Sequence, residues 1–412
     1  MTGAPVCRLC GERLALTVVD LGEVPIANDL LRSQDLDRRE PVYPLHARAC
    51  ESCWLVQVDD VVPPGALFGD YTYFSSISSS WVEHARQFAT AAAADLGLDS
   101  ESLVLEVASN DGYLLRHFVQ LGIPVLGVEP AETVAAASLE AGIPTEITFF
   151  GMDVAERIRA EHGLADLIVA NNVVAHVPDL RDLLGGMKHV LASSGVISVE
   201  VPHVLNLLAG VQFDTIYHEH YSYFSLFSIE RAFESVGLAV HDVEQLSTHG
   251  GSLRLWTTHV ESGRPPSDRL IALRRREQHV GVATPGLYRG FCERVERCRD
   301  ATLAYLTDAR VAGRRVAGYG AAAKATTFTN YCGITSADIE FVADSSPHKQ
   351  GRWIPGSRLP IVAPEELRAR RPDDVLVFAW NLKHEIAEQL AFVSEWSGRI
   401  LVAVPEIDVV SP

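Results

Sequence analysis

The sequence predicts an α/β protein in which a small N-terminal cysteine-rich module precedes two α/β units, each built on a parallel sheet. Two C-x-x-C pairs lie within the first 53 residues. Apolar strands alternate with helices between residues 103 and 200, and a second alternation begins near residue 314. Such alternation produces parallel sheets with helices on both faces. The length of 412 residues also exceeds one ordinary domain.

The composition describes a globular chain with an acidic surface. Hydrophobic residues make up 47% of the sequence, charged residues make up 21%, and the net charge is −18. No basic block is present, which argues against nucleic acids and anionic membranes as partners. No apolar run reaches membrane-spanning length, and residues 1–8 lack the core of a signal peptide. We therefore expect a cytoplasmic protein with no membrane partner, and a monomer.

Four cysteines near the start have the spacing of a zinc site. Cys7 and Cys10 form one C-x-x-C pair, Cys50 and Cys53 form the other, and 39 residues separate the pairs. Two residues between thiolates let both sulfurs reach one tetrahedral ion, whereas the long separation implies inserted strands. The alternative is free or redox thiols; seven cysteines in total argue against a disulfide framework. Four thiolates would close the coordination sphere, so we expect structural zinc.

The expected elements follow one another in a regular order. After an aromatic and serine-rich connector, a helix is expected from about residue 81 to 96. Short apolar runs bounded by turn residues then predict buried parallel strands. A charge-rich helical connector leads from the first unit to the second. The expected strands are 103–108, 124–129, 166–171, 195–201, 314–320, 339–344, 375–380 and 399–404. The expected helices are 131–140, 180–191, 321–331 and 383–392, with a turn running into a helix over 109–118 and a helical connector over 262–310 that is broken near Pro285.

Polar and small residues gather where the strands of the first unit end. A parallel sheet binds its ligands at this edge, and a small-residue turn that opens a helix brings N–H groups to the ligand. The carboxylate of Glu129 could accept both ribose hydroxyls of NAD or of S-adenosylmethionine. The turn lacks G-x-G-x-x-G, which favours a cofactor without phosphate, S-adenosylmethionine, over NAD or a fold with surface polar residues only. The expected cofactor residues are Glu106, Ala108, Asn110, Asp111, Gly112, Glu129 and Asn171.

The segment T-I-Y-H-E-H-Y-S-Y-F-S is the most unusual stretch of the chain. It places two histidines, one glutamate and three tyrosines within seven residues, among them Tyr217, Glu219 and His220. Another histidine, His176, follows an earlier strand. Imidazole has a reference pKa of about 6.5, so these rings could transfer protons near neutral pH. A metal site on His-x-His and a satisfied polar network are the alternatives; catalysis is favoured because the segment returns to the cofactor edge.

The second unit carries a nucleotide-binding pattern. G-Y-G-A-A-A-K runs from Gly318 to Lys324 after a strand, matches G-x-G-x-x-A, and is followed by Asp344 after 26 residues. This pattern alone would favour an NAD-dependent oxidoreductase with a zinc module. The diphosphate of a nucleotide sugar fits equally well, because Lys324 adds a cation in the first helical turn. The loop after Asp344 supplies two further cations, Lys349 and Arg352.

Together these motifs resemble the sugar C-methyltransferases of deoxysugar and antibiotic biosynthesis. The resemblance covers nearly the whole chain and rests on the paired C-x-x-C module, E-V-A-S-N-D-G-Y, A-N-N-V-x-A-H, T-I-Y-H-E-H-Y-S-Y-F-S, G-Y-G-A-A-A-K and D-x-x-P-x-K-Q-G-x-x-x-P-G. It implies a zinc module over 1–70 and a Rossmann-like class I methyltransferase domain over 71–260 that binds S-adenosylmethionine. A second Rossmann-like domain over 261–412 would hold a nucleotide sugar and no NAD.

The resemblance also implies a reaction on a dTDP-linked 4-keto-deoxyhexose, in which some family members methylate C3 and others C5; we expect C3. His220 looks like the general base for the carbon beside the ketone, with Glu219 orienting it. Tyr217, His176 and Tyr71 would line the same pocket, and Tyr217 and His176 are candidate donors to the enolate oxygen. The enolate would then attack the sulfonium methyl. The implied sugar-nucleotide residues are Tyr319, Lys324, Asp344, Lys349 and Arg352.

Overall fold

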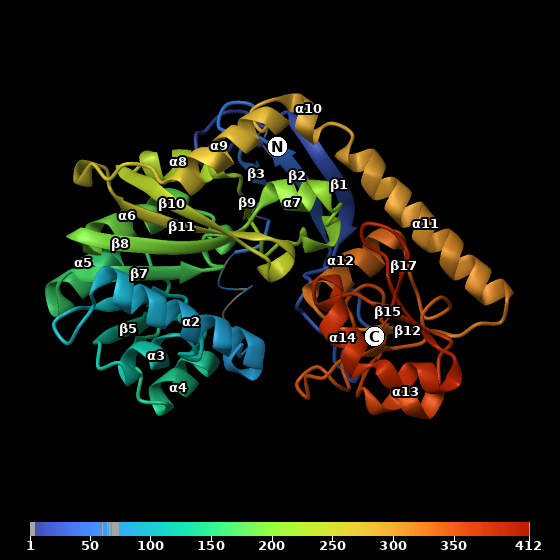
Figure 1. The fold of residues 1–412 in the computed structure, drawn as a ribbon. Coiled ribbons are helices and arrows are strands. Elements are labelled where there is room, and N and C mark those ends of the chain that lie inside the picture. Colours follow the sequence, from blue (N-terminus) through green and yellow to red (C-terminus); the bar gives the residue numbers. More distant parts are fainter. Residues whose placement is uncertain (1–4, 60, 64, 66, 68–73, 412) are drawn as a thin grey trace.

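Three sheets form the framework of the protein. The structure is a computed structural model and describes residues 5–59, 61–63, 65, 67 and 74–411. A small antiparallel sheet near the top of Figure 1 lies between a central α/β unit and a C-terminal α/β unit. The predicted fold class, with two α/β units and an N-terminal cysteine module, is confirmed. Within the described ranges, no helix has the length and apolar character needed to cross a bilayer.

The small sheet combines the cysteine module with the histidine segment. Its order is β1-β2-β3-β9 and every neighbouring pair is antiparallel. The inserted strands that the cysteine spacing implied are β1 and β2, which lie between the two C-x-x-C pairs. The fourth strand comes from the histidine segment, far along the chain. The strands are β1 (Leu16–Val24), β2 (Tyr43–Ala49), β3 (Val56–Gln57) and β9 (Ser222–Tyr223).

The central sheet has seven strands in the order β10-β11-β8-β7-β4-β5-β6. The strands from β4 to β8 are parallel, and the hairpin of β10 and β11 adds two antiparallel strands. The chain runs outward from β4 to β6 and then returns to β7, so a crevice opens between β4 and β7 at their carboxyl ends. The strands are β4 (Val104–Val107), β5 (Val125–Val128), β6 (Thr145–Glu146), β7 (Ala165–Asn171), β8 (Leu191–Pro202), β10 (Leu238–Leu246) and β11 (Ser252–His259).

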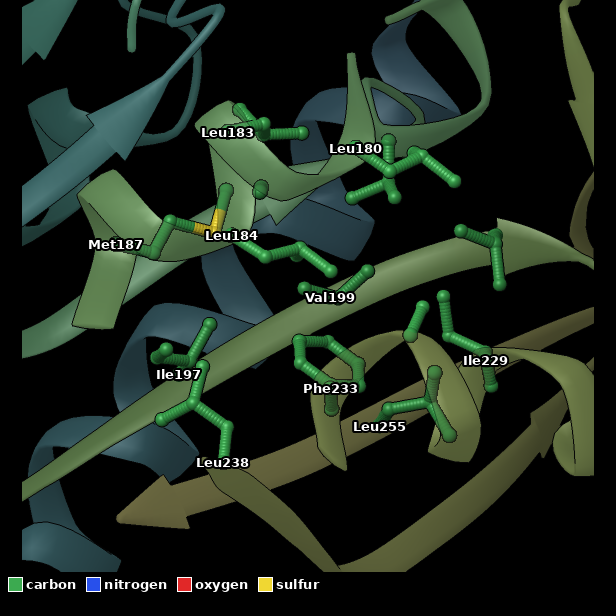
Figure 2. Packing of buried hydrophobic residues seen from close by; sticks show 14 of the residues in the cluster. Leu180, Leu183, Leu184, Met187, Ile197, Val199, Ile229, Phe233, Leu238 and Leu255 are labelled. Atoms are coloured by element: carbon green, nitrogen blue, oxygen red, sulfur yellow. The ribbon is translucent and has the colours of Figure 1, made fainter. Parts of the chain in front are cut away.

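Helices cover both faces of the central sheet, as a sheet with apolar runs on both faces requires. Figure 2 shows one of these layers, in which Leu184 of α6 and Phe233 of α8 point toward Val199 on β8. All three side chains are almost fully buried. The helices are α2 (Ser79–Leu96), α3 (Leu115–Gln120), α4 (Glu132–Glu140), α5 (Met152–His162), α6 (Leu180–Val190), α7 (Val204–Ala209) and α8 (Leu226–Glu234).

The C-terminal sheet has the order β14-β13-β12-β15-β16-β17, with only β17 antiparallel to its neighbour. Its strand order reverses between β12 and β15, which creates a second crevice. The connector to this unit comprises α9, α10 and the long helix α11 (Figure 1). The elements are α9 (Asp268–Val280), α10 (Pro285–Tyr288), α11 (Phe291–Val311), β12 (Val316–Tyr319), α12 (Ala323–Cys332), β13 (Val342–Ala343), β14 (Ile361–Val362), α13 (Glu365–Arg370), β15 (Asp374–Val377), α14 (Lys383–Gln389), β16 (Arg399–Val402) and β17 (Asp408–Val410).

One apolar cluster joins the small sheet to the C-terminal unit. It contains Leu45 of β2, Val204 of α7, Val295 of α11 and Phe328 of α12. All four are at most 2% exposed. The module therefore packs against both units, and the parts share a core.

Candidate active site

A cavity of about 710 Å³ lies where the three parts meet. Asn171 contributes to it from the carboxyl edge of the central sheet, His220 from the histidine segment and Lys324 from the start of α12. Asn28 of the N-terminal module also lines it. The three sequence signals predicted separately thus face one space, whose size suits a ligand of the drug or cofactor class.

The turn after β4 has an unusual backbone that explains its small and polar residues. Ala108, Asn110 and Gly112 adopt left-handed conformations with φ of 56°, 51° and 73°. A Cβ on Gly112 would lie 2.3 Å from Ile143 Cδ1, so glycine is required there. Glu129 stabilises the turn, because its Oε2 accepts the Asn110 N–H at 2.9 Å. Its Oε1 accepts the Ala131 N–H at 2.9 Å, and each oxygen retains a lone pair for a further donor.

The predicted cofactor residues divide into two groups. Ala108, Asn110, Glu129 and Asn171 line the cavity, whereas the other three lie behind it. Glu106 is 1% exposed, and burial raises the pKa of its carboxyl well above the ordinary range. The Asp111 Oδ2 accepts the Ser76 N–H at 3.1 Å, and Gly112 packs against Ile143 and Ser138. In the structure Glu106, Asp111 and Gly112 therefore support the turn, and their direct contact with the cofactor stays a prediction.

Aromatic residues that the sequence analysis did not assign also line this part of the cavity. Trp81 and Tyr113 stack with ring centroids 6.1 Å apart, and Phe149 lies at the edge with 48% of its surface exposed. An exposed phenylalanine on a cavity rim is a signal for ligand contact. In the sequence, this phenylalanine belongs to the apolar I-T-F-F run that follows β6.

His220 has a defined tautomer in the structure. Its Nδ1 lies 3.1 Å from the backbone oxygen of Thr215, which can only accept, so Nδ1 carries the hydrogen. In the neutral ring the Nε2 then holds the lone pair. This atom accepts a hydrogen bond from the Tyr217 hydroxyl at 2.8 Å. This arrangement suits a base, and the role of His220 as the general base stays a prediction.

The Nδ1–H of His176 is also bound by a backbone oxygen, and burial shifts the pKa of this ring. Its ring lies against His220 with centroids 4.6 Å apart, and its Nδ1–H donates to the Glu219 backbone oxygen at 2.7 Å. Burial lowers the pKa of His176 to about 4. The neutral ring therefore has an unprotonated Nε2, which accepts hydrogen bonds and does not donate them. Donation from His176 to an enolate oxygen would require the protonated ring, and this role stays a prediction.

Glu219 does not orient His220 with its carboxylate. Its Oε1 accepts hydrogen bonds from the backbone N–H and the side-chain Nδ2 of Asn28, at 3.3 and 3.1 Å. The side chain is buried outside the cavity lining, and burial raises the pKa of its carboxyl. Its structural contribution is the backbone oxygen that holds His176. Tyr71, the fifth residue predicted for this pocket, lies outside the described residues.

The two histidines of His-x-His do not form a metal pair. His218 is 2% exposed and its Nε2–H donates to the Pro44 backbone oxygen at 3.3 Å, within the N-terminal module. His220 faces the cavity. Among the described residues these rings have separate partners, so the metal alternative for this segment is not supported.

The C-terminal unit contributes cations to the opposite wall. Lys324 and Lys349 line the cavity. Asp344 is already occupied: its Oδ2 accepts the Ala321 N–H at 2.7 Å, and its Oδ1 accepts the Ser346 N–H at 2.8 Å. The Lys349 ammonium also lies 3.6 Å from Oδ2. A carboxylate covered in this way is poorly placed to bind the ribose of NAD, which disfavours the oxidoreductase alternative.

Three predicted sugar-nucleotide residues lie outside the cavity lining. Tyr319 is 6% exposed and packs in the core on the far side of the C-terminal sheet, and burial raises its pKa. Asp344 supports the turn before α12 instead of facing the cavity. Arg352 lies in the loop after Lys349 and does not contribute to the lining. Direct substrate contact by Tyr319, Asp344 and Arg352 stays a prediction.

The four cysteines form a candidate metal centre. Their sulfurs all lie within 4.8 Å of one another, with separations of 3.5 Å for Cys7–Cys53 and for Cys10–Cys50. Sulfurs that share a tetrahedral zinc ion at 2.3 Å would be about 3.8 Å apart, so the cluster fits zinc. The side-chain amide of Gln57 donates to Cys7 Sγ at 3.2 Å, a contact typical of metal-bound thiolates.

Comparisons with known proteins agree with this arrangement. Three family profiles match successive parts of the chain: zinc binding domain over 7–68, methyltransferase domain over 81–243, and C-methyltransferase C-terminal domain over 247–405. The chain is 37% identical to the C-methyltransferase NovU of Streptomyces niveus over 405 residues, which are 98% of this chain and 96% of NovU.

Solved structures that resemble the chain cover less than half of it. The magnesium protoporphyrin IX methyltransferase of Synechocystis PCC 6803 is 14% identical over 47% of this chain and 91% of its own, with a TM-score of 0.35. The CcbJ methyltransferase of Streptomyces caelestis is 12% identical over 42% and 89%, with a TM-score of 0.33.

The fold and the family profiles define an S-adenosylmethionine-dependent methyltransferase. More specifically, the chain belongs to the C-methyltransferase family that includes NovU. The resemblance predicted from the motifs is confirmed.

Proposed function

We propose that this C-methyltransferase acts on a dTDP-linked 4-keto-deoxyhexose of deoxysugar and antibiotic biosynthesis and methylates the carbon beside the ketone, C3 in preference to C5. One observation carries the proposal: the cofactor edge at Asn171, the base His220 and the cation Lys324 line the same cavity. A carbon acid, a methyl donor and a diphosphate can thus be bound together. Holding reactants side by side supplies much of the rate enhancement of such reactions.

His220 is proposed as the general base. A hydrogen on the carbon beside a ketone is acidic once the resulting enolate is stabilised. The Thr215 carbonyl keeps the proton on Nδ1, so the neutral ring carries on Nε2 the lone pair that would take the substrate hydrogen. The ketone would re-form as the enolate carbon takes up the methyl group, and the proton on His220 Nε2 would then pass to solvent.

Tyr217 is proposed as the donor that stabilises the enolate oxygen. Its hydroxyl donates to His220 Nε2 at 2.8 Å in the structure, and would turn to the enolate oxygen when Nε2 takes the substrate hydrogen. A well-placed donor of this kind contributes about 3–4 kcal/mol to the transition state. His176, with an unprotonated Nε2, is suited to accept a hydrogen bond from a sugar hydroxyl or amine.

The residues at the central sheet edge fit S-adenosylmethionine. Glu129 can accept the ribose hydroxyls, and the buried Asn171 Oδ1 has no hydrogen-bond partner among the described residues. When bound, this cofactor supplies an electrophilic methyl group on a sulfonium. Trp81 and Tyr113 present aromatic surface beside that site and help to exclude water.

The direct test combines the methyl donor with a set of substrates. We expect the protein to convert at least one member of a panel of dTDP-4-keto sugars into a methylated product, measured by mass spectrometry with methyl-labelled S-adenosylmethionine. His220→Asn should abolish this product while S-adenosylhomocysteine still binds, and His162→Asn, a surface change on α5, should behave as the wild type. The absence of product from every panel member would contradict the substrate class. Wild-type turnover by His220→Asn would show that His220 is not the general base.

A further inference from the structure

The Lys324 ammonium is held in an unusual way. Its Nζ donates to the Asn381 Oδ1 at 2.7 Å and lies 5.1 Å from the centre of the Trp380 ring. Both of these partners are neutral and both belong to the 3-10 helix η7 (Trp380–Leu382). Burial lowers the pKa of Lys324 and the nearby Asp214 carboxylate opposes this shift, while neither of the two direct contacts neutralises the ammonium.

Trp380 is itself held by a buried acid. Its indole N–H donates to Asp214 Oδ2 at 2.7 Å, and Asp214 is 1% exposed. Burial raises the pKa of Asp214 to about 6, and the Lys324 charge opposes that shift. A Cβ on Gly250 would lie 2.7 Å from the indole Cη2, so the ring is also packed on its far side.

Asp214 lies in a segment that also orients the base. It belongs to the 3-10 helix η4 (Phe213–Thr215), whose last carbonyl holds His220 Nδ1–H. The same segment is attached to α12: Phe213 stacks on Phe328 with centroids 5.7 Å apart, and Thr327 Oγ1 donates to the Ile216 oxygen at 3.0 Å. Residues 213–216 therefore connect the part of the cavity wall that carries Lys324 to the imidazole ring of His220.

We propose that Asp214 and Trp380 are positioning residues for the diphosphate of the nucleotide sugar. The Asp214 carboxylate accepts the indole N–H of Trp380, and the indole in turn contacts the Lys324 ammonium. Because Asp214 lies in η4, these contacts fix the distance between the ammonium and His220. The inference rests on the proposed function, since it takes the ligand to be a nucleotide sugar. Anchoring the diphosphate at one wall would deliver the keto carbon to the base at the other.

Two conservative variants isolate this role. Trp380→Phe keeps an aromatic side chain but removes the indole N–H together with the second ring, and Asp214→Asn keeps the shape and removes the charge. We expect both to weaken dTDP binding by about tenfold, as loss of a hydrogen bond to a charged group does. The KM for the nucleotide sugar should rise and kcat should fall, while the affinity for S-adenosylhomocysteine stays the same.

The test is calorimetric titration of each full-length variant with dTDP and, separately, with S-adenosylhomocysteine. Trp396→Phe and Asp300→Asn are matched controls on the C-terminal unit and on α11, and both should titrate as the wild type. If Asp214→Asn fails to fold, Trp380→Phe still decides. Unchanged dTDP affinity in Trp380→Phe would overturn this inference and leave the proposed function unaffected. A wild-type protein that binds S-adenosylhomocysteine but not dTDP would overturn the proposed substrate and the inference together.

Discussion

At the scale of single residues, two backbone oxygens determine what the cavity histidines can do. Thr215 and Glu219 each accept an Nδ1–H, from His220 and His176 respectively. Both rings therefore carry their lone pair on Nε2 when neutral. The sequence could identify these histidines by type and spacing. It could not give their tautomers, because those depend on carbonyls whose direction is a property of the folded loop.

The buried ring of His176 leads to a pH prediction. Its folded-state pKa is about 4, below the ordinary 6.5, so between these values the unfolded chain binds more protons than the folded one. His176 should therefore lower stability as the pH falls from about 6.5 to 4, and have no such effect at higher pH. We expect the loss of unfolding free energy between pH 7.5 and 5 to be smaller in His176→Gln.

Urea denaturation at the two pH values measures this loss. The matched control is His162→Gln, because His162 lies on the surface of α5. An equal loss in the wild type and in His176→Gln would show that the ring is not kept neutral by the fold.

Gly112 provides a second prediction at this scale, because conformation and space both exclude a side chain there. A Cβ would lie 2.3 Å from Ile143 and 2.8 Å from Ser138, and both neighbours are buried. Gly122 has a similar φ of 77° with open space around it. Gly122→Ala should cost about 1 kcal/mol for the left-handed backbone. Gly112→Ala should cost a further 1–3 kcal/mol, about the cost of overpacking, and weaken S-adenosylhomocysteine binding. Equal losses of unfolding free energy would contradict the steric argument.

At the scale of elements, the parallel strands were the easiest to predict and the antiparallel ones the hardest. Strands β4, β5, β7 and β12 are short apolar runs buried on both faces, and a strand was expected at each. The β10–β11 hairpin was not predicted, since its polar alternation does not stand out from a surface segment. Helix α3 begins at Leu115, after the cofactor turn, as the expected turn running into a helix over 109–118 indicated.

Strand β9 has two residues and could not be predicted, yet it links the cysteine cluster to the histidine segment. Tyr223 pairs with Val56 on β3, and Gln57 of the same strand donates to Cys7 Sγ. His220 stands two residues before β9. Pairing between segments so distant in sequence leaves no local pattern.

We therefore propose that the four cysteines hold one structural zinc ion, and that losing it disturbs the active site. Cys50→Ser should lose the zinc, about one ion per chain, and most methyl transfer, because β3 no longer holds β9 in place. Elemental analysis and activity assays check this. Cys292→Ser, on α11, should keep both zinc and activity. Full activity in a zinc-free Cys50→Ser protein would contradict the link.

At the scale of the whole molecule, three parts with a shared core enclose one cavity. The sequence predicted each part and most residue types at the site. It placed Glu219, Tyr319 and Arg352 in the cavity, where the structure does not put them, because motif membership does not give the direction of a side chain. The N-terminal module also reaches the cavity through Asn28, a contribution with no sequence signal.

The central claim is that His220 removes a hydrogen from the carbon beside the ketone, and isotope exchange tests it most directly. With S-adenosylhomocysteine in place of the methyl donor, the wild-type enzyme in deuterium oxide should exchange that hydrogen of a dTDP-4-keto sugar. His220→Asn should bind both ligands and exchange at the uncatalysed rate. Exchange by His220→Asn at the wild-type rate would contradict the account.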